Sequence, residues 1–306
     1  MIIKPMRLKS GDAVGVIAPA SPPNMVDLER GICFLEGMGL KVILGKHLEK
    51  SIGYIAGTDN ERLEDFHSVF ENNEVKAVIC ARGGYGSAKF ANQINYDLIK
   101  KNPKIFMGYS DITFLHTAIG RQTGMVTFHG PMVCSDFGQE TLSSITYHSI
   151  QLLFEPMIMA YTEMISPLET IVEGVARGPV TGGNLTLLTS TLGTKFELDT
   201  VGKLLFVEEI GEEPRCVDRM LNQLYMAGKL NHISGFLIGD FHECESKDVK
   251  SFTVKEVLDY YIKLVSKPSM SGFKMGHCSP NICIPLGVTA TLNTCEKSLE
   301  IEAGVL

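Results

Sequence analysis

Ser110 stands where a serine can act as a nucleophile. It follows an apolar run at residues 105–108 and a tight turn at 108–110, and an amphipathic stretch at 112–120 comes after it. A serine at such a strand-to-helix turn projects out of the sheet, at the positive end of a helix dipole that stabilises an oxyanion. The segment lacks the last glycine of G-x-S-x-G, and a serine at a helix start is commonly an N-cap. On this segment alone both interpretations stay open.

The loop Arg82-Gly-Gly-Tyr-Gly86 follows a second apolar run, at residues 75–81. Adjacent glycines allow backbone N–H groups to turn towards an anion. A phosphate cradle is disfavoured, because neither G-x-x-x-x-G-K-[ST] nor a complete G-x-G-x-x-G is present. The loop is therefore either a plain turn or an oxyanion-hole loop that faces Ser110.

Glu208 and Glu209 end an apolar run at residues 203–207. Neighbours in a strand point to opposite faces, so only one of the two acids can face a given site. A buried carboxylate can hold a histidine in one tautomer and stabilise its protonated form. The alternative is a solvated strand end, where paired acids are usually found.

His277 lies in a loop with proline and asparagine, before the apolar run at residues 284–292. A loop histidine on a strand scaffold is a candidate general base, although the chain has eight histidines. With Cys278 and Cys283 it does not match zinc-ligand spacing, so we expect no metal and no other cofactor. Ser110, Glu208 and His277 together follow one of the residue orders known for catalytic triads.

The elements expected in the first half alternate between strands and helices. Strands are predicted at 13–18, 41–44, 75–81, 105–108 and 125–129, with helices at 24–38, 59–72, 87–93 and 112–120. This rhythm predicts an α/β domain with a flavodoxin- or Rossmann-like parallel sheet. Active sites in such sheets lie beyond the carboxyl ends of the strands, where the glycine loop and Ser110 both fall.

The second half has a different pattern, with helices predicted at 214–227 and 253–265 and strands at 203–207, 235–241, 284–292 and 298–301. Residues 154–166 are predicted to be an irregular connector. We therefore expect an N-terminal α/β domain at 1–155, a linker at 156–170 and a β-rich α+β domain at 171–306. The site then lies in the cleft between the domains, a common place for ligands.

Composition excludes several classes of function. The net charge of the 306-residue chain is −7, and no basic run is present, which disfavours a nucleic-acid partner. No apolar stretch reaches the roughly 18 residues of a membrane span, and the first residues lack the apolar core of a signal peptide. Eight cysteines without a C-x-x-C pair indicate reduced thiols, so we expect a cytoplasmic protein.

The chain resembles the LD-carboxypeptidases, serine peptidases that include the microcin C self-immunity proteins. The segments that carry the resemblance run in order over nearly the whole chain: Gly11-Asp-Ala-Val-Gly-Val-Ile-Ala-Pro-Ala-Ser21, Ala81-Arg-Gly-Gly-Tyr-Gly86, Gly108-Tyr-Ser-Asp-Ile-Thr113, His129-Gly-Pro-Met132, Gly182-Gly-Asn-Leu185, Phe206-Val-Glu-Glu209, Asp218-Arg-Met-Leu221, Gly276-His277 and Pro285-Leu-Gly287. The resemblance implies a metal-free peptidase that forms a homodimer and recycles cell-wall peptides in the cytoplasm.

The resemblance also implies roles for single residues. By position, Ser110 is the nucleophile, His277 the base and Glu208 the orienting acid, with Glu209 as the alternative because the family usually has Glu-Asp at this place. The remaining implied roles are an oxyanion hole from the backbone N–H groups of Gly84 and Asp111, and substrate contacts from Arg82 and Asn184. Arg219 is a second candidate for binding a terminal carboxylate.

Two substrate classes remain within the family. One is the murein tetrapeptide, cut between diaminopimelate or lysine and the terminal D-Ala; the other is a peptidyl- or aminoacyl-nucleotide. The chain has no tryptophan on which a nucleobase would stack, which favours the murein peptide. Outside the family, the alternatives are a small-molecule binding protein without catalysis and a dinucleotide-dependent enzyme, the latter disfavoured by the missing glycine fingerprint.

Overall fold

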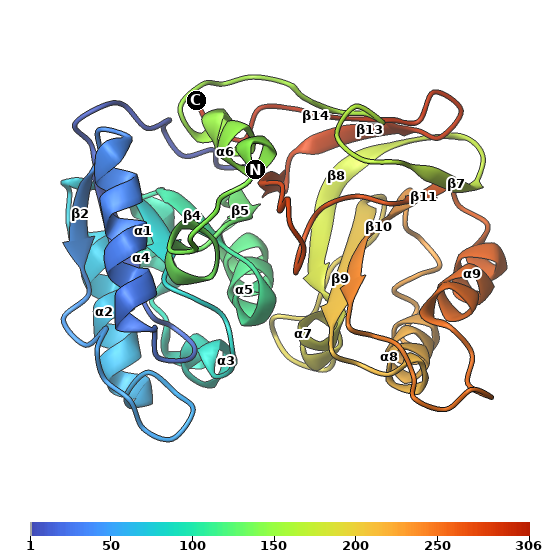
Figure 1. The fold of residues 1–306 in the computed structure, drawn as a ribbon, viewed down its shortest axis with the longest axis horizontal. Coiled ribbons are helices and arrows are strands. Elements are labelled where there is room, and N and C mark those ends of the chain that lie inside the picture. Colours follow the sequence, from blue (N-terminus) through green and yellow to red (C-terminus); the bar gives the residue numbers. More distant parts are fainter. Residues whose placement is uncertain (1) are drawn as a thin grey trace.

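The computed structural model describes residues 2–306 and contains two β-sheets side by side (Figure 1). The first sheet has six strands in the order β12-β5-β4-β3-β1-β2. All neighbours in it are parallel except β12, which runs antiparallel to β5. Its strands are β1 (Ala13–Ile17), β2 (Lys41–Leu44), β3 (Val75–Cys80), β4 (Ile105–Gly108), β5 (Thr127–His129) and β12 (Ile284–Leu286).

Helices cover both faces of the first sheet, as its apolar strands require, since β1 and β4 are buried along their whole length. One face packs against α1, whose Leu28 and Leu35 are buried, and the other against α2, α4 and α5. The helices of this half are α1 (Met25–Gly37), α2 (Asp59–Glu71), α3 (Ser87–Phe90), α4 (Tyr96–Lys101), α5 (Thr113–Thr123) and α6 (Ser144–Ser149). Short 3₁₀ segments are η1 (Ala91–Gln93), η2 (Ser110–Ile112) and η4 (Ile150–Leu153), and η3 (Val133–Phe137) is a π-helical turn.

The second sheet has eight strands in the order β6-β14-β13-β8-β9-β10-β11-β7. Its centre, from β8 to β11, is parallel and its margins are antiparallel. The strands are β6 (Met159–Tyr161), β7 (Glu169–Val172), β8 (Val175–Asn184), β9 (Leu204–Ile210), β10 (Gly235–His242), β11 (Ser269–Ser271), β13 (Thr289–Asn293) and β14 (Ser298–Ile301). Three helices, α7 (Leu185–Ser190), α8 (Pro214–Met226) and α9 (Val254–Val265), pack on one face of it.

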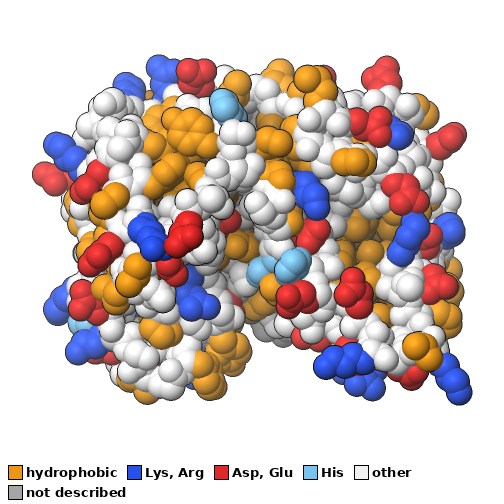
Figure 2. Space-filling model, in the orientation of Figure 1, with side chains coloured by type: hydrophobic (Ala, Val, Ile, Leu, Met, Phe, Trp, Pro, Cys, Tyr) orange, Lys and Arg blue, Asp and Glu red, His pale blue; other side chains and the backbone are white. Residues whose placement is uncertain are grey.

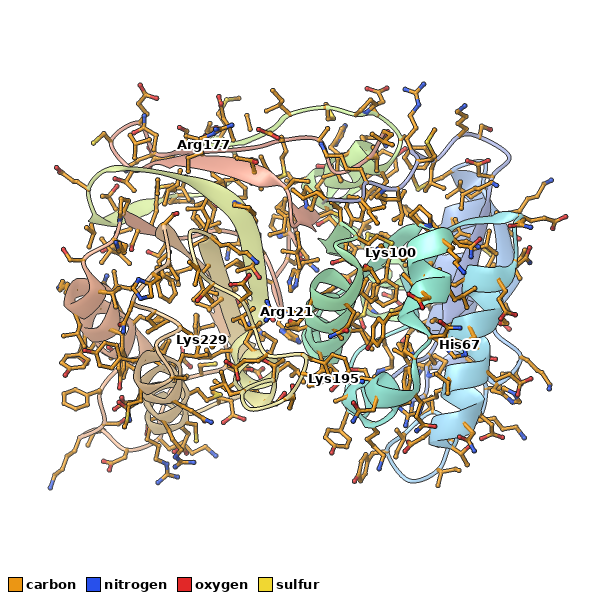
Figure 3. The ribbon with its side chains drawn as sticks, turned by 180° about the vertical axis from the view of Figure 1, so that it is seen from behind. His67, Lys100, Arg121, Arg177, Lys195 and Lys229 are labelled. Carbon is orange, nitrogen blue, oxygen red and sulfur yellow. The ribbon has the colours of Figure 1, made fainter. Side chains whose placement is uncertain are left out.

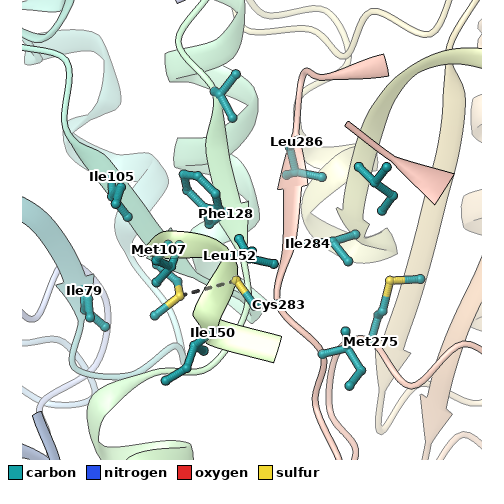
Figure 4. Close-up of a cluster of buried hydrophobic side chains, with 14 of the residues drawn as sticks. Ile79, Ile105, Met107, Phe128, Ile150, Leu152, Met275, Cys283, Ile284 and Leu286 are labelled. Atoms are coloured by element: carbon teal, nitrogen blue, oxygen red, sulfur yellow. Dashed lines mark hydrogen bonds between the residues drawn. The ribbon is translucent and has the colours of Figure 1, made fainter. Parts of the chain in front are cut away.

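One buried apolar cluster joins the two halves. It contains Ile79 and Met107 from the first sheet and Phe206 and Met275 from the second half. Figure 4 shows this continuity, with the Cys283 thiol 3.6 Å from the Met107 sulfur. One face of the second sheet therefore packs against the first half through this cluster, and α7, α8 and α9 cover the opposite face.

The predicted fold class, an α/β domain beside a β-rich α+β unit, is confirmed. Two details of the sequence prediction are wrong. Residues 154–166 are not wholly irregular, because they contain β6, which pairs with β14. The predicted strand at 284–292 is two strands, β12 and β13, which lie in different sheets because the chain turns at Gly287, where φ is +95°. The division into 1–155, 156–170 and 171–306 stays a prediction, with β12 crossing into the first sheet.

No helix within residues 2–306 combines the length and the apolar character needed to cross a membrane.

Candidate active site

Ser110 lies at a strained turn between β4 and α5. Its φ is +64°, in the left-handed region that residues with a side chain rarely adopt. The side chain is partly exposed, and across residues 2–306 its hydroxyl makes no hydrogen bond. An N-cap would bond to the helix, so the structure favours the nucleophile elbow over the capping interpretation.

Two buried histidines lie beneath this elbow. His116, on α5, donates from Nε2 to the carbonyl oxygen of Gly108 at 2.8 Å. Burial lowers the pKa of His116 to about 4, so the ring is neutral and its Nε2 proton is fixed by that bond. His129, at the end of β5, lies 6.3 Å from it between ring centroids, and burial lowers its pKa well below the ordinary value. The neutral His116 ring therefore supports the end of β4, the strand that precedes Ser110.

The glycine loop lies directly against the elbow. A Cβ atom at Gly83 would stand 2.7 Å from Ser110 Cβ and 2.9 Å from its Oγ, so only glycine fits there. Ser87 ties the loop to the elbow, because its N–H donates to the Asp111 carboxylate at 2.8 Å and its hydroxyl to the Asp111 carbonyl oxygen at 2.7 Å. Within residues 2–306 the N–H groups of Gly84 and Asp111 donate no hydrogen bond. Both are free to donate to a ligand, and their role in an oxyanion hole stays a prediction.

Replacing Gly83 with alanine is expected to lower kcat/KM by about 10²-fold, because the new methyl group displaces Ser110 from its productive position. Gly120→Ala is the matched control, since Gly120 lies in α5 and a Cβ atom added there would meet nothing within 4 Å. That control should leave activity unchanged and stabilise the helix by up to about 1 kcal/mol. Equal activity of the two variants in a steady-state assay would contradict the close approach of Gly83 to the nucleophile.

Glu208 and His277 form a buried acid–base pair. His277 Nδ1 lies 2.7 Å from Glu208 Oε2, and Glu208 has no exposed surface. Gly276, with φ +108°, permits this approach, because a Cβ there would overlap the Glu208 carboxyl group. Burial alone would lower the pKa of His277, but the hydrogen bond to Glu208 and the charge of that carboxylate outweigh it and raise the pKa.

Glu209 points to the opposite face, as strand alternation predicts. Its carboxylate accepts hydrogen bonds from Asn184 Nδ2 at 2.7 Å and from the N–H and hydroxyl of Thr186, both at 2.8 Å. Asn184 also caps α7, because its Oδ1 accepts from the N–H of Leu187 at 3.2 Å. Glu209 therefore anchors α7, and the acid that meets His277 is Glu208.

The substrate contact expected of Asn184 is not what the structure shows. This side chain is 3% exposed, and its amide is bonded to Glu209 and Leu187. The capping role has a local signal, since asparagine before a helix is a preferred N-cap. The sequence therefore contained a signal for the N-cap role that Asn184 has in the structure.

Tyr109 brings the two parts of the site together. Its ring meets the His277 ring edge-on with 5.0 Å between centroids, and it is the residue before Ser110. No hydrogen bond joins Ser110 to His277 in the described chain, and such bonds commonly tighten only when substrate is bound. Figure 2 shows histidine and acidic side chains gathered where the halves meet. Ser110 and His277 thus come from different halves, and Tyr109, the residue before Ser110, contacts the His277 ring.

Arg82 is the better placed of the two candidate cations. Arg82 and Arg219 are both exposed, and neither has an ion pair within residues 2–306. Arg82 adjoins Gly83, which contacts Ser110, whereas Arg219 lies on α8. On the far face, Arg121 is already paired with Asp199 at 3.7 Å (Figure 3). Arg82 is therefore the candidate cation whose loop lies against the Ser110 turn.

Three residues near His277 were missed by the sequence analysis: Tyr109, Asp136 and Asn281. They lie far apart along the chain, and no local spacing connects them. Within residues 2–306 no group of three histidine, cysteine or acidic side chains is arranged to hold a metal ion.

Two family profiles and several known proteins are similar to this chain. Residues 14–130 match the profile of the LD-carboxypeptidase N-terminal domain, and residues 177–292 match that of the C-terminal domain. The chain is 54% identical to the probable murein peptide carboxypeptidase of Bacillus subtilis, over 99% of this chain and 95% of that protein. It is 30% identical to the murein tetrapeptide carboxypeptidase of Pseudomonas aeruginosa, over 91% of this chain and 92% of the relative.

Solved structures show the same fold. The microcin C7 self-immunity protein MccF, in complex with glutamyl sulfamoyl guanosine, superimposes with a TM-score of 0.90 at 28% identity, covering 98% of each chain. The muramoyltetrapeptide carboxypeptidase of Oxalobacter formigenes gives a TM-score of 0.86 at 28% identity, covering 95% of this chain and 98% of the other.

Proposed function

The chain belongs to the LD-carboxypeptidase family of serine-type carboxypeptidases, and from that premise we propose that it removes the terminal D-Ala from murein tetrapeptides by a Ser-His-Glu mechanism. The observation that carries the mechanism is the 2.7 Å contact between Glu208 and His277, together with the contact of His277 with Tyr109, the residue before the strained Ser110. The substrate class is supported by the relatives named for murein peptides. Cell-wall recycling in the cytoplasm belongs to the same proposal.

The proposed reaction is acyl transfer. His277 takes the proton of the Ser110 hydroxyl as its oxygen attacks the scissile carbonyl, and the N–H groups of Gly84 and Asp111 hold the oxyanion. His277 then gives that proton to the departing amine of D-Ala. Water, deprotonated by the same ring, hydrolyses the acyl-serine and restores the enzyme. Glu208 holds the Nδ1 side of the ring and stabilises the imidazolium.

Arg82 is proposed to bind the carboxylate of the terminal D-Ala. An exopeptidase needs a cation at a fixed distance from the nucleophile, and a guanidinium pairs with a carboxylate through two parallel hydrogen bonds. Arg82 is held by the loop that also supplies the Gly84 N–H group. This arrangement would admit a chain end and exclude the middle of a longer peptide.

The pH dependence of kcat/KM should report the raised pKa of His277. The base acts in its neutral form, so activity is lost as pH falls through the pKa of this ring in the folded protein. Because Glu208 raises that pKa, half-maximal activity on the acid side is expected above the ordinary histidine value of about 6.5. A pH–rate profile measures it, and a midpoint clearly below that value would contradict a carboxylate-paired base.

A second candidate function is cleavage of an aminoacyl-nucleotide. It is favoured by the likeness to MccF, solved with aspartyl sulfamoyl adenosine and, as a tryptophan-to-phenylalanine variant, with adenosine monophosphate. This chain has no tryptophan to stack on a nucleobase. The murein peptide is therefore the preferred substrate.

Mass spectrometry of small peptides tests the proposal. The protein is incubated with L-Ala-γ-D-Glu-diaminopimelyl-D-Ala, with the lysine form, and separately with glutamyl sulfamoyl guanosine. Loss of one D-Ala from a tetrapeptide supports the carboxypeptidase, and the two forms reveal the preferred third residue. Release of glutamate from the nucleotide alone would move the assignment to the immunity branch.

A homodimer is also part of the proposal, because the family resemblance implies one. Analytical ultracentrifugation should give twice the mass of the 33.6 kDa chain. A single species of monomer mass at micromolar concentration would remove this part and leave the proposed chemistry unaffected.

A further inference from the structure

Asp136 is a carboxylate that the proposed triad does not use. It lies in the π-helical turn η3, a kind of turn often found at functional sites. Within residues 2–306 it has no ion pair, and burial raises its pKa to about 6. Asp136 is half-buried, and a partly desolvated carboxylate without a cation lowers stability, so its presence calls for a role.

Hydrogen bonds lead from Asp136 to the loop that carries His277. Asp136 Oδ2 accepts from the N–H of Met132 at 2.9 Å, and Oδ1 accepts from Asn281 Nδ2 at 3.4 Å. Asn281 is 1% exposed, and its Oδ1 accepts from the N–H of Gly276 at 3.2 Å. The first half is thereby connected to the residue before His277.

Asn281 is fixed from a second direction as well. Its backbone N–H donates to the Thr146 hydroxyl, in α6, at 2.9 Å. The side chain is held by Asp136 and Gly276 and the backbone by Thr146, so Asn281 has little freedom to move. The position of the His277 loop therefore depends on the first half, which carries Ser110.

The charge of Asp136 also reaches His277. It raises the pKa of the imidazole, after the larger effects of burial, Glu208 and Glu209, and the charge of His277 lowers the pKa of Asp136 in return. The titratable groups around His277 are Glu208, which contacts it, Asp136 from η3, Tyr109 from the elbow, His129 from β5, and the adjacent Cys278, which lies near Asp240 and Lys274; Glu209 acts on it only through its charge, from the opposite face of β9. The acids outnumber the cations, so the site favours a protonated ring.

We propose that Asp136 and Asn281 are positioning residues for His277. Asn281 holds the loop in register with Ser110, and Asp136 supplies a further negative charge, from the first half of the chain, that stabilises the imidazolium formed during acyl transfer. The part that concerns turnover rests on the proposed peptidase function. The part that concerns the ionisation of His277 holds for any substrate.

Two variants separate the two effects. Asp136→Asn keeps the size and an acceptor oxygen but removes the charge, so kcat should fall by about 10- to 100-fold with KM changed less than about threefold. The pKa of His277, followed by NMR titration of its ring carbon-bound protons, should be lower than in the wild type. Asn281→Ala breaks the link and leaves the charge, so kcat should fall while the pKa of His277 stays nearer the wild-type value.

Thermal unfolding distinguishes positioning from support of the fold. Asp136→Asn removes a half-buried charge that has no ion pair and should leave Tm unchanged or higher while activity falls. The control is Asp65→Asn, since Asp65 is 3% exposed, accepts from the N–H of His47 at 3.0 Å and lies away from the site. This control also removes a buried carboxylate charge, and it should leave both kcat and the pKa of His277 unaltered, whatever its effect on Tm.

Two results together would overturn the proposal. The pKa of His277 in Asp136→Asn would equal the wild-type pKa, and the kcat of this variant would equal that of the Asp65→Asn control. The titration needs no substrate. A wild-type protein that leaves the tetrapeptide intact therefore refutes the proposed function and still permits this test.

Discussion

Ser110→Ala is expected to lower kcat by at least about 10⁴-fold while the protein stays folded. The hydroxyl makes no hydrogen bond within the described chain, so its removal takes away no structural contact. The strained backbone remains, with φ +64° in the wild type, because alanine has the same Cβ as serine. What is lost is the atom that forms the acyl-enzyme, and residual turnover would come from the oxyanion hole and binding alone.

The measurement is release of D-Ala from the tetrapeptide, with circular dichroism to check the fold. The variant should still bind tetrapeptide, so isothermal titration should return a dissociation constant similar to the wild-type KM. Ser68→Ala is the control, because its hydroxyl donates to the Asp65 carbonyl oxygen at 2.9 Å, within α2 and away from the site. If Ser110→Ala kept the activity of this control, the nucleophile assignment would be wrong.

Local sequence features were sufficient to predict the scaffold of the nucleophile. The apolar run before Ser110 is β4, and the amphipathic stretch after it is α5. The side-chain alternation that separates Glu208 from Glu209 also holds, with one acid on His277 and the other on Asn184. These features depend on the period of a strand or a helix, which a sequence displays directly.

Long-range partners could not be predicted in this way. Asp136 and Asn281 are separated by 145 residues, and neither stands in a pattern that points to the other. The run at 284–292 contains the right apolar residues, yet its periodicity does not show that β12 joins the first sheet and β13 the second. Which sheet a strand joins is decided by the whole packed core, to which Cys283 and Met107 both contribute.

The two neighbouring acids provide the sharpest test of the site, because one substitution at each position is predicted to have opposite effects. Glu208→Gln should lower kcat by about 10³- to 10⁴-fold, since an amide can neither hold the working tautomer of His277 nor stabilise its charge. Stability should change little, because one buried Glu208 oxygen has no partner within residues 2–306 in the wild type. The pKa of His277 should fall as well, because its largest favourable contact is lost.

Glu209→Gln should instead lower stability by about 1–3 kcal/mol and leave most of the activity. The Glu209 carboxylate accepts from Asn184, from the N–H and hydroxyl of Thr186 and from its neighbour Ile210 at 2.9 Å, so a new amide group must face donors. Denaturant unfolding and kcat, measured on both variants, give a two-by-two comparison. Loss of turnover in Glu209→Gln with a stable, active Glu208→Gln would reverse the assignment of the orienting acid, because the strand permits only one of the two to meet His277.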